Sequence, residues 1–373
     1  MEEQSRVTRQ PQRPKKRRRH RGLKLILVLL ILILGIGGFI AARAYNSAKD
    51  AIKSTYSPLS SSFKSARDVA SVLKAGKPIS VLLLGTDTGS LDRSYTGRTD
   101  SIMIATINPT TKTTTLVSIP RDSMVSIPGF EAYFPMKINA AYEFPANGKG
   151  HPETTIKTLQ NYLNVPIDFY ALINMGGLEK MVDKVGGVVV KSPLTFTYQP
   201  NNKKTNTYKF VKGQSKYQYA SDGKHFKTYK VMNGQAALAF SRMRYTDPLG
   251  DYGRQKRQRL VLTALAKKST NISSLFSADF FKAIAKNVQT NLSFDDIMTL
   301  MAKYRVATKH IKSDHIQGVN YMYNGQSFQI LSDTNRQKAT NLIRQNLDLQ
   351  AKTTGNRFGG QVTNGVVIPE VSN

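Results

Sequence analysis

Two stretches of the chain place carboxylates beside arginines with spacings that suit the chemistry of phosphate esters. The first stretch begins at Arg98 and Asp100, runs through alternating apolar residues, turns at 108–110 and returns as a β-rich run to Arg121. This pattern predicts a hairpin with Asp100 and Arg121 at neighbouring ends. A guanidinium binds phosphate oxygens and a carboxylate can bind a divalent cation, and phosphoryl transfer uses both. The alternative interpretation is a surface ion pair at the end of a hairpin.

The second stretch lies much later in the chain and is predicted to open a helix. There, Arg254 would face Arg257 and Gln258 at the i+3 and i+4 positions, with Asp251 one turn earlier. Like charges this close on one helix face repel each other unless an anion lies between them. A merely solvated face would alternate positive and negative charges, and this one does not. The segment therefore favours an anion-binding site.

The remaining candidate chemistry concerns a metal ion. Asp87 follows a predicted buried strand, 79–84, and lies between two glycines, which is a typical site position in α/β proteins. The chain has no Cys, so thiolate metal sites, disulfides and Cys nucleophiles are excluded. Its 5 His residues form no cluster with ligand spacing, which argues against zinc. Hard carboxylate oxygens therefore favour Mg²⁺, or alternatively Mn²⁺, bound together with phosphate.

The charge of the chain predicts a polyanionic partner. Lys and Arg number 54 against 24 Asp and Glu, which gives a net charge of +30. Nucleic acid, anionic lipid and a phosphate-rich polymer are the partner classes that such a balance suits. Beyond Arg43, 43 basic and 22 acidic residues remain, so that part alone carries a net charge of +21.

The N-terminal segment predicts where that partner is found. Residues 1–24 form a basic tail with 10 Lys or Arg, and residues 25–45 contain an uncharged aliphatic run from Leu25 to Ala42. That run nearly spans a bilayer core of ~30 Å. Basic residues ahead of it predict a cytoplasmic N-terminus and a single-pass signal-anchor in the cell membrane. Everything after Arg43 would then be extracellular, which argues against nucleic acid. A cleavable signal peptide is the alternative, since Ala42-Arg43-Ala44 is a small-x-small sequence.

Alternating strand and helix patterns predict an α/β fold. We expect one exported α/β(α) sandwich domain over 78–348, with a central mixed β-sheet flanked by helices and one transmembrane helix before it. Residues 46–77 would form a stalk, and 349–373 a loose tail. Within the domain we expect helices at 153–163, 175–185 and 233–240, a helix start at 137–142, and strands at 167–173 and 186–190.

Residues 193–230 differ in amino-acid composition from the rest of that domain. Eight lysines and five tyrosines interleave there with little acidic charge. One interpretation is a solvated β excursion. The other is a flap over a glycan, in which aromatic faces stack on sugars and lysines hold phosphates.

An ordered set of short motifs resembles the LytR-CpsA-Psr family. The motifs are Gly85-Thr-Asp87, Arg98-Thr-Asp100, Ser118-Ile-Pro-Arg121-Asp122, Lys137-Ile-Asn139, Arg242-x-Arg244 and Asp251-x-x-Arg254-x-x-Arg257-Gln258. The resemblance covers residues 79–270, and the predicted N-terminal anchor agrees with it.

The resemblance implies an extracytoplasmic, Mg²⁺-dependent phosphotransferase of Gram-positive bacteria. Such an enzyme moves a glycopolymer (teichoic acid, or a capsular or other secondary polysaccharide) from a polyprenyl-pyrophosphate carrier to a peptidoglycan hydroxyl. It implies metal binding by Asp87 and Asp100, and catalytic roles for Asp100, Arg121 and Asp251, of which Asp251 would orient the arginines or act as base. It also implies that the pyrophosphate is bound by Arg98, Arg121, Lys137, Arg242, Arg244, Arg254, Arg257 and Gln258.

Two other functions are open to such a chain. The first is a membrane-tethered module that binds anionic wall polymer without chemistry. The second is a transcriptional regulator, which the basic tail suggests and which the predicted membrane span and basic exported domain oppose.

Overall fold

The computed structural model describes residues 45–373, apart from 48, 87–96, 201–204, 270–277, 364, 369, 372 and 373. The chain divides into two units, Met1–Ser47 and Ala48–Asn373, and the fold below is that of the second. The predicted tail 1–24 and all but the last residue of the predicted membrane segment 25–45 lie outside the described residues. Among the described residues, no helix is long and apolar enough to cross a membrane.

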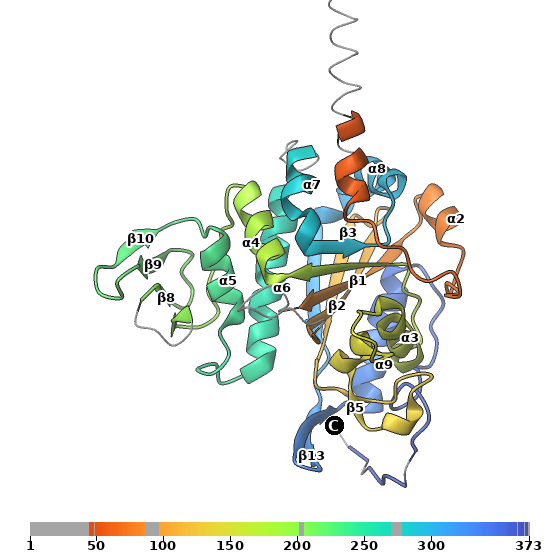
Figure 1. Cartoon of the computed structure of the whole chain (residues 1–373). Helices are drawn as coiled ribbons and strands as arrows, with labels where there is room; N and C mark the ends of the chain where they lie inside the picture. Colours follow the sequence, from red (N-terminus) through yellow and green to blue (C-terminus); the bar gives the residue numbers. More distant parts are fainter. Residues whose placement is uncertain are drawn as a thin grey trace, which may run out of the picture. The chain divides into compact units, whose positions relative to one another are not determined.

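A mixed sheet of six strands forms the centre of the unit (Figure 1). In sheet order the strands are β11 (Val288–Thr290), β6 (Phe169–Asn174), β1 (Ile79–Thr86), β2 (Thr99–Asn108), β3 (Thr113–Ile119) and β12 (His310–His315). The β2–β3 pair is the antiparallel hairpin that the sequence predicts, while β1 pairs in parallel with β6 and β3 with β12. Strand β1 is almost continuously apolar because both of its faces are covered.

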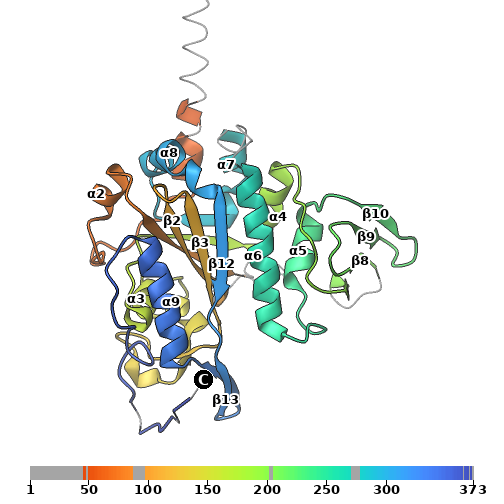
Figure 2. The ribbon, with the colours of Figure 1, turned by 180° about the vertical axis from the view of Figure 1, so that it is seen from behind.

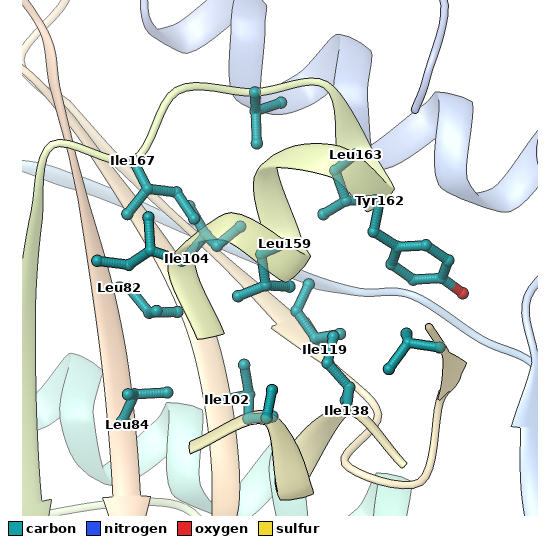
Figure 3. Close-up of a cluster of buried hydrophobic side chains, with 14 of the residues drawn as sticks. Leu82, Leu84, Ile102, Ile104, Ile119, Ile138, Leu159, Tyr162, Leu163 and Ile167 are labelled. Atoms are coloured by element: carbon teal, nitrogen blue, oxygen red, sulfur yellow. The ribbon is translucent and has the colours of Figure 1, made fainter. Parts of the chain in front are cut away.

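Alternate residues of β1 enter two different cores. Leu82 and Leu84 pack with helices α3 (Pro152–Leu163) and α9 (Asp333–Asn346), which cover one face of the sheet (Figure 2). Figure 3 shows this cluster, in which Leu82, Leu84 and Ile104 of the sheet lie together with Leu159, Tyr162 and Leu163 of α3. Val81 and Leu83 point to the other face, toward α2 (Val69–Lys74) and α8 (Phe294–Lys303). This alternation is the two-residue period of a strand buried on both sides.

A second layer of helices and strands lies beside the sheet, to the left in Figure 1. It consists of α4 (Met175–Lys184), α5 (Gly234–Arg242), α6 (Gly250–Ser269), α7 (Ala278–Ile284) and a four-stranded antiparallel sheet of β7 (Phe196–Tyr198), β8 (Thr207–Phe210), β9 (Tyr217–Ala220) and β10 (Lys227–Tyr229). These elements share one hydrophobic cluster. The segment 193–230 that the sequence set apart therefore forms this smaller sheet, the insert sheet below.

The remaining elements are short. They are β4 (Met124–Val125), η1 (Glu131–Tyr133), β5 (Met136–Lys137), η2 (Ile138–Glu143), η5 (Ala285–Asn287), η6 (Arg305–Thr308), β13 (Val319–Tyr323) and β14 (Gln326–Ile330). The expected helix start at 137–142 is thus a 3₁₀ helix, and the expected strand at 186–190 is reduced to one bridge between Val188 and Met232.

Two segments that we placed outside the domain, the stalk and the loose tail, have residues that pack on it. In the expected stalk, Ile52 is buried in the cluster of the second layer, and the Arg67 guanidinium donates to Asp168 at 2.7 Å. In the expected tail, Phe358 is buried, and its carbonyl accepts a hydrogen bond from the backbone N–H of Ser126 at 2.7 Å. The apolar residues of the two segments follow no clear helical or strand period. Both segments contact residues that are far away in the sequence, so local patterns did not predict their packing.

Candidate active site

A cavity of about 870 Å³ lies between the sheet and helices α4, α5 and α6. One part of its wall is apolar, from the strands and from α4 and α6, and is formed by Leu83, Leu84, Met103, Ala171, Leu172, Ile173, Met175, Leu178, Met181, Leu262 and Val288. The other part carries charge and polar groups, from Asp100, Arg121, Ser241, Arg242, Arg244, Arg254 and Gln258. The lining of the cavity therefore combines an extensive apolar surface, called the apolar slot below, with a cluster of arginines.

Arg121 is the centre of the charged part. Its Nη1 donates to Asp100 Oδ1 at 2.6 Å, and its Nε lies 3.6 Å from both Asp122 Oδ2 and Asp251 Oδ1. Arg254 Nη2 forms an ion pair with Asp251 and also reaches the Asp100 carbonyl at 3.4 Å. Two arginines thus share three carboxylates, and these come from two regions that are far apart in the sequence.

Local structure explains how Arg121 and Asp100 meet. Asp100 lies in the β2 end of the hairpin, and Arg121 follows Pro120 directly after β3. The turn after Arg121 is held by backbone bonds, from Ser123 N–H to the Pro120 carbonyl at 3.1 Å and from Asn139 N–H to the Arg121 carbonyl at 3.1 Å. The rigid turn leaves the Arg121 side chain 15% exposed and fixed in direction.

The two arginines differ in their electrostatic balance. Burial acts to lower the pKa of Arg121, but the carboxylates of Asp100, Asp251 and Asp122 outweigh it and raise that pKa above its usual value. For Arg254, burial dominates, the nearby Arg121 adds to its effect, and the pKa is lowered despite the carboxylate of Asp251. Arg254 is therefore a buried cation that its neighbours neutralise incompletely, and an anion in the cavity would stabilise it.

The cavity also contains donors and acceptors that the described chain does not use. Arg254 Nε and Gln258 Oε1 are buried and have no hydrogen-bond partner within the described residues. Arg242 and Arg244 line the cavity, and neither forms an ion pair in the part of the chain that the structure describes. Buried polar groups of proteins are normally satisfied, so Arg254 Nε indicates an anionic or other acceptor in the cavity, and Gln258 Oε1 indicates a donor such as a hydroxyl.

These residues are those of the motifs described above, and the comparisons agree with that assignment. The LytR_cpsA_psr family matches residues 40–345 of the sequence. The chain belongs to this family.

Individual relatives of the LytR_cpsA_psr family cover most of the chain. The "Polyisoprenyl-teichoic acid--peptidoglycan teichoic acid transferase TagU" of Enterococcus faecalis is 37% identical over 291 residues, which are 78% of this chain and 85% of that protein. Among solved structures, protein gbs0355 from Streptococcus agalactiae has a TM-score of 0.63 and 34% identity, covering 78% of this chain and 94% of that one. The structure "TagT bound to LIIa-WTA" has a TM-score of 0.57 and 25% identity, covering 79% of this chain and all (100%) of that one.

The residues that the family resemblance implied do not all reach the cavity. The expectation that Arg257 binds pyrophosphate needs correction. Its side chain is fully buried and does not line the cavity; it forms an ion pair with Asp247 and donates to the Phe240 carbonyl at 2.9 Å. Gly253 makes room for this pair, because a Cβ there would lie 1.9 Å from the Asp247 carboxylate. Arg257 therefore stabilises the fold and is not available to bind pyrophosphate.

Two other expected phosphate ligands lie beside the cavity and do not line it. Arg98 has a side chain that is 48% exposed, and its Nε contacts Glu143 at 3.3 Å. Lys137 Nζ forms an ion pair with Asp122 at 3.0 Å. Asp87, expected as a metal ligand, lies outside the described residues. Asp251 supports the arginines from behind, which fits an orienting role.

Three contributors were missed by reasoning from the sequence. Asp122 connects Arg121 to Lys137, and the sequence named it as part of the Ser118–Asp122 motif without giving it a role. Tyr252 on α6 donates to Gln329 at 2.8 Å, and the Gln329 N–H donates to the Asp122 carbonyl at 2.8 Å, so β14 braces both halves of the site. The insert sheet also contributes Thr197, Tyr198 and Gln199 to the cavity wall.

Proposed function

We propose that the chain transfers teichoic acid from a polyprenyl-pyrophosphate carrier to a peptidoglycan hydroxyl. The observation that carries the proposal is the single cavity in which an apolar slot meets an arginine cluster. A polyprenyl chain fits the slot and its pyrophosphate fits the cluster. The name of the Enterococcus faecalis relative, a teichoic acid transferase acting on a polyisoprenyl-linked donor and peptidoglycan, supports this substrate pair.

The chemistry follows from the charges around the pyrophosphate. The acceptor hydroxyl oxygen bonds to the phosphorus nearest the glycan, and the bond from that phosphorus to the bridging oxygen breaks. Polyprenyl phosphate leaves with the electron pair of that bond. Arg121, Arg254 and Arg244 stabilise the negative charge that develops on the phosphate oxygens and the leaving group. No covalent enzyme intermediate is needed, so the site requires no activated nucleophile.

The proton of the acceptor hydroxyl needs a carboxylate within the cavity. Asp100 lines the cavity, whereas Asp251 lies behind Arg121 and Arg254 and bonds to both Arg254 and Gln255. Asp100 is therefore the base in this proposal, and Asp251 holds the arginines in place.

A divalent cation, Mg²⁺ or Mn²⁺, belongs to the proposal. Proteins commonly bind Mg²⁺ through one or two carboxylates together with substrate phosphates. Asp100 is suited to this because Arg121 engages only its Oδ1 among the described contacts, and Asp87 would supply the second carboxylate. Such a cation would neutralise phosphate charge and orient the pyrophosphate. Chelation with EDTA is expected to abolish transfer and Mg²⁺ to restore it; full activity in excess chelator would remove Asp100 and Asp87 from this role.

The location of the reaction follows from the N-terminal segment. We propose that residues 25–45 anchor the protein in the cell membrane, with the N-terminus in the cytoplasm and the domain outside. The donor's hydrocarbon chain would then enter the slot from the same membrane, and the acceptor would be the surrounding peptidoglycan.

The test is a transfer assay with the full-length protein, a polyprenyl-pyrophosphate-linked teichoic acid and peptidoglycan fragments. We expect the unchanged protein to release polyprenyl phosphate and to couple polymer to peptidoglycan, and Asp100→Ala to lose transfer while still binding donor. If the unchanged protein and Asp100→Ala bind the donor equally well and neither transfers polymer, the protein is a membrane-tethered binding module.

A further inference from the structure

The insert sheet has one aromatic face, built by the register of its four strands. One cross-strand row consists of Phe196, Phe210, Tyr217 and Tyr229 on successive strands. Its neighbouring rings lie 4.8, 5.6 and 5.4 Å apart from centroid to centroid. The inner rings also contact Phe240 of α5, with Phe210 at 5.2 Å. These inner rings are core, since Phe196, Phe210 and Tyr217 are each at most 5% exposed.

The aromatic row reaches the surface only at its outer end. Tyr229 of β10, the last ring of the row, is 38% exposed, and Tyr219 on β9 is partly buried beside it at 6.4 Å. In Figure 1, β9 and β10 lie on the side of the insert sheet away from α6. Of the two interpretations of residues 193–230, the flap over a glycan cannot use the buried Tyr208 and Tyr217 for stacking on sugars. Of the four rings in this row, Tyr229 is the one that reaches the surface.

Four exposed lysines lie near that ring along the chain. Lys227 and Lys230 flank it in sequence, and Lys216 directly precedes Tyr217, its cross-strand partner. Lys224 lies in the turn between β9 and β10. The side chains of all four lysines are exposed. Lys216 and Lys230 are next to Tyr217 and Tyr229, the last pair of this ladder, so strand alternation directs them to the other face of the sheet, whereas Lys227 shares the face of Tyr229.

The described residues of the insert sheet offer these lysines no counter-charge. Asp222 is the one acidic residue between 193 and 230, against eight lysines. Its carboxylate forms an ion pair with His225 and accepts the backbone N–H groups of Lys224 and His225, both at 2.9 Å. The insert thus carries +7 of the +21 charge beyond Arg43 in 38 of 330 residues. A solvated face would mix both signs, so this concentration indicates an anionic ligand.

The insert sheet is continuous with the cavity. Its first strand, β7, contributes Thr197 and Tyr198 to the cavity wall, while β10 forms the opposite edge of the same sheet. A polymer joined to a pyrophosphate in the cavity must leave through the polar end. The insert sheet therefore connects the cavity wall, at β7, to the β9–β10 edge.

We propose that the β9–β10 edge, defined by Lys216, Lys224, Lys227, Lys230 and Tyr229, is a second binding site for the phosphate-containing polymer, distinct from the pyrophosphate site. The lysines bind successive phosphodiesters, and Tyr229 supports the apolar face of a sugar or polyol. This inference rests on the proposed function, because it names the part of the donor that lies outside the cavity. The site would favour long charged donors over short ones.

The test compares two variants with four substitutions each, made in the full-length protein in neutral detergent. The first replaces Lys216, Lys224, Lys227 and Lys230 with Gln. The matched control replaces Lys112, Lys149, Lys338 and Lys352 with Gln, which are exposed lysines outside the insert. The probe is synthetic poly(glycerol phosphate) of ten units, with uncharged dextran of similar length as the blank. An exposed charge pair contributes a factor of about 2 to 3 in affinity, so the first variant should bind roughly 20- to 80-fold more weakly.

The control variant should bind the probe within about 2-fold of the unchanged protein, and the dependence of affinity on salt should weaken only in the first variant. Replacing the same four insert lysines with Arg should preserve binding. In transfer assays, the first variant should show a higher KM than the unchanged protein for a donor with a long polymer. Its KM for a donor with one disaccharide should change less. Equal losses in both variants would mean that only net charge matters and would overturn the proposal.

Three further outcomes separate the inference from the alternatives. If the first variant loses affinity for phosphatidylglycerol vesicles and keeps its affinity for poly(glycerol phosphate), the β9–β10 edge binds membrane and the proposal fails. If the unchanged protein transfers neither donor, the proposed function fails, while the binding comparison still decides the site. If transfer proceeds and the first variant binds the probe as well as the control does, the function stands and the site does not.

Discussion

Replacing Arg121 should impair transfer more than any other single change in the arginine cluster. Arg121 is the one side chain that contacts Asp100 at 2.6 Å and also approaches Asp122 and Asp251 at 3.6 Å. Arg121→Ala removes a charge-assisted donor to the phosphate and leaves three carboxylates close to it. Loss of such a donor costs about 2–4 kcal/mol of transition-state stabilisation, or roughly a 30- to 1,000-fold loss in rate.

Two variants separate geometry from charge. Arg121→Lys should recover only part of the activity, because an ammonium cannot reproduce the planar, bidentate fork of a guanidinium. Lys256→Ala should be nearly silent, since Lys256 is exposed on α6 and does not line the cavity. The assay is the initial rate of polymer transfer, resolved into kcat and KM, with thermal unfolding measured for each variant.

One result would refute the reasoning about Arg121. If Arg121→Ala and Lys256→Ala transferred polymer at equal rates, only net positive charge would matter. The network of Arg121 with Asp100 and Asp251 would then have no part in catalysis. A loss of activity in Arg121→Ala that Arg121→Lys restored fully would also contradict the bidentate role.

Three further outcomes are expected. Arg257→Ala should destabilise the fold by about 3–5 kcal/mol in urea denaturation, because it leaves the Asp247 carboxylate buried and unpaired; a change below 1 kcal/mol would contradict the structural role. Leu178→Trp should obstruct the apolar slot and raise the KM for donors with a long polyprenyl chain more than for short-chain donors, and equal KM changes would argue against the slot. A reporter fused after Asn373 should be active only outside the cytoplasm, and cytoplasmic activity would reverse the topology.

Local patterns in the sequence were sufficient to predict much of the sheet and of the site. The alternating run that contains Asp100, the turn at 108–110 and the return to Arg121 predicted the β2–β3 hairpin, which the structure confirms. Strand pairing through a short turn is local, so few alternatives compete with it. Helices α3 and α4 were also predicted from the sequence, because their apolar residues recur with the period of a helix.

The roles of the α6 residues required the tertiary structure. Gln258 and Arg257 lie four and three residues beyond Arg254, so helical spacing places both near its face. Gln258 lines the cavity, whereas Arg257 turns inward because Asp247 and the Phe240 carbonyl neutralise it there. Partners from other elements decide between two positions that the helical period does not distinguish.

Sequence by itself determined which residues carry charge and which segments form the hairpin and the principal helices, since these depend on neighbours along the chain. Only the tertiary structure decided which charges meet. Asp251 comes next to Arg121, 3.6 Å away, and residues 49–77 and the segment around Phe358 pack on the domain because their partners are distant in the sequence. The insert's tyrosines likewise divide into core and surface by strand register, with Tyr217 buried and Tyr229 exposed. Contacts between distant segments depend on how the whole chain packs, and no local pattern contains that information.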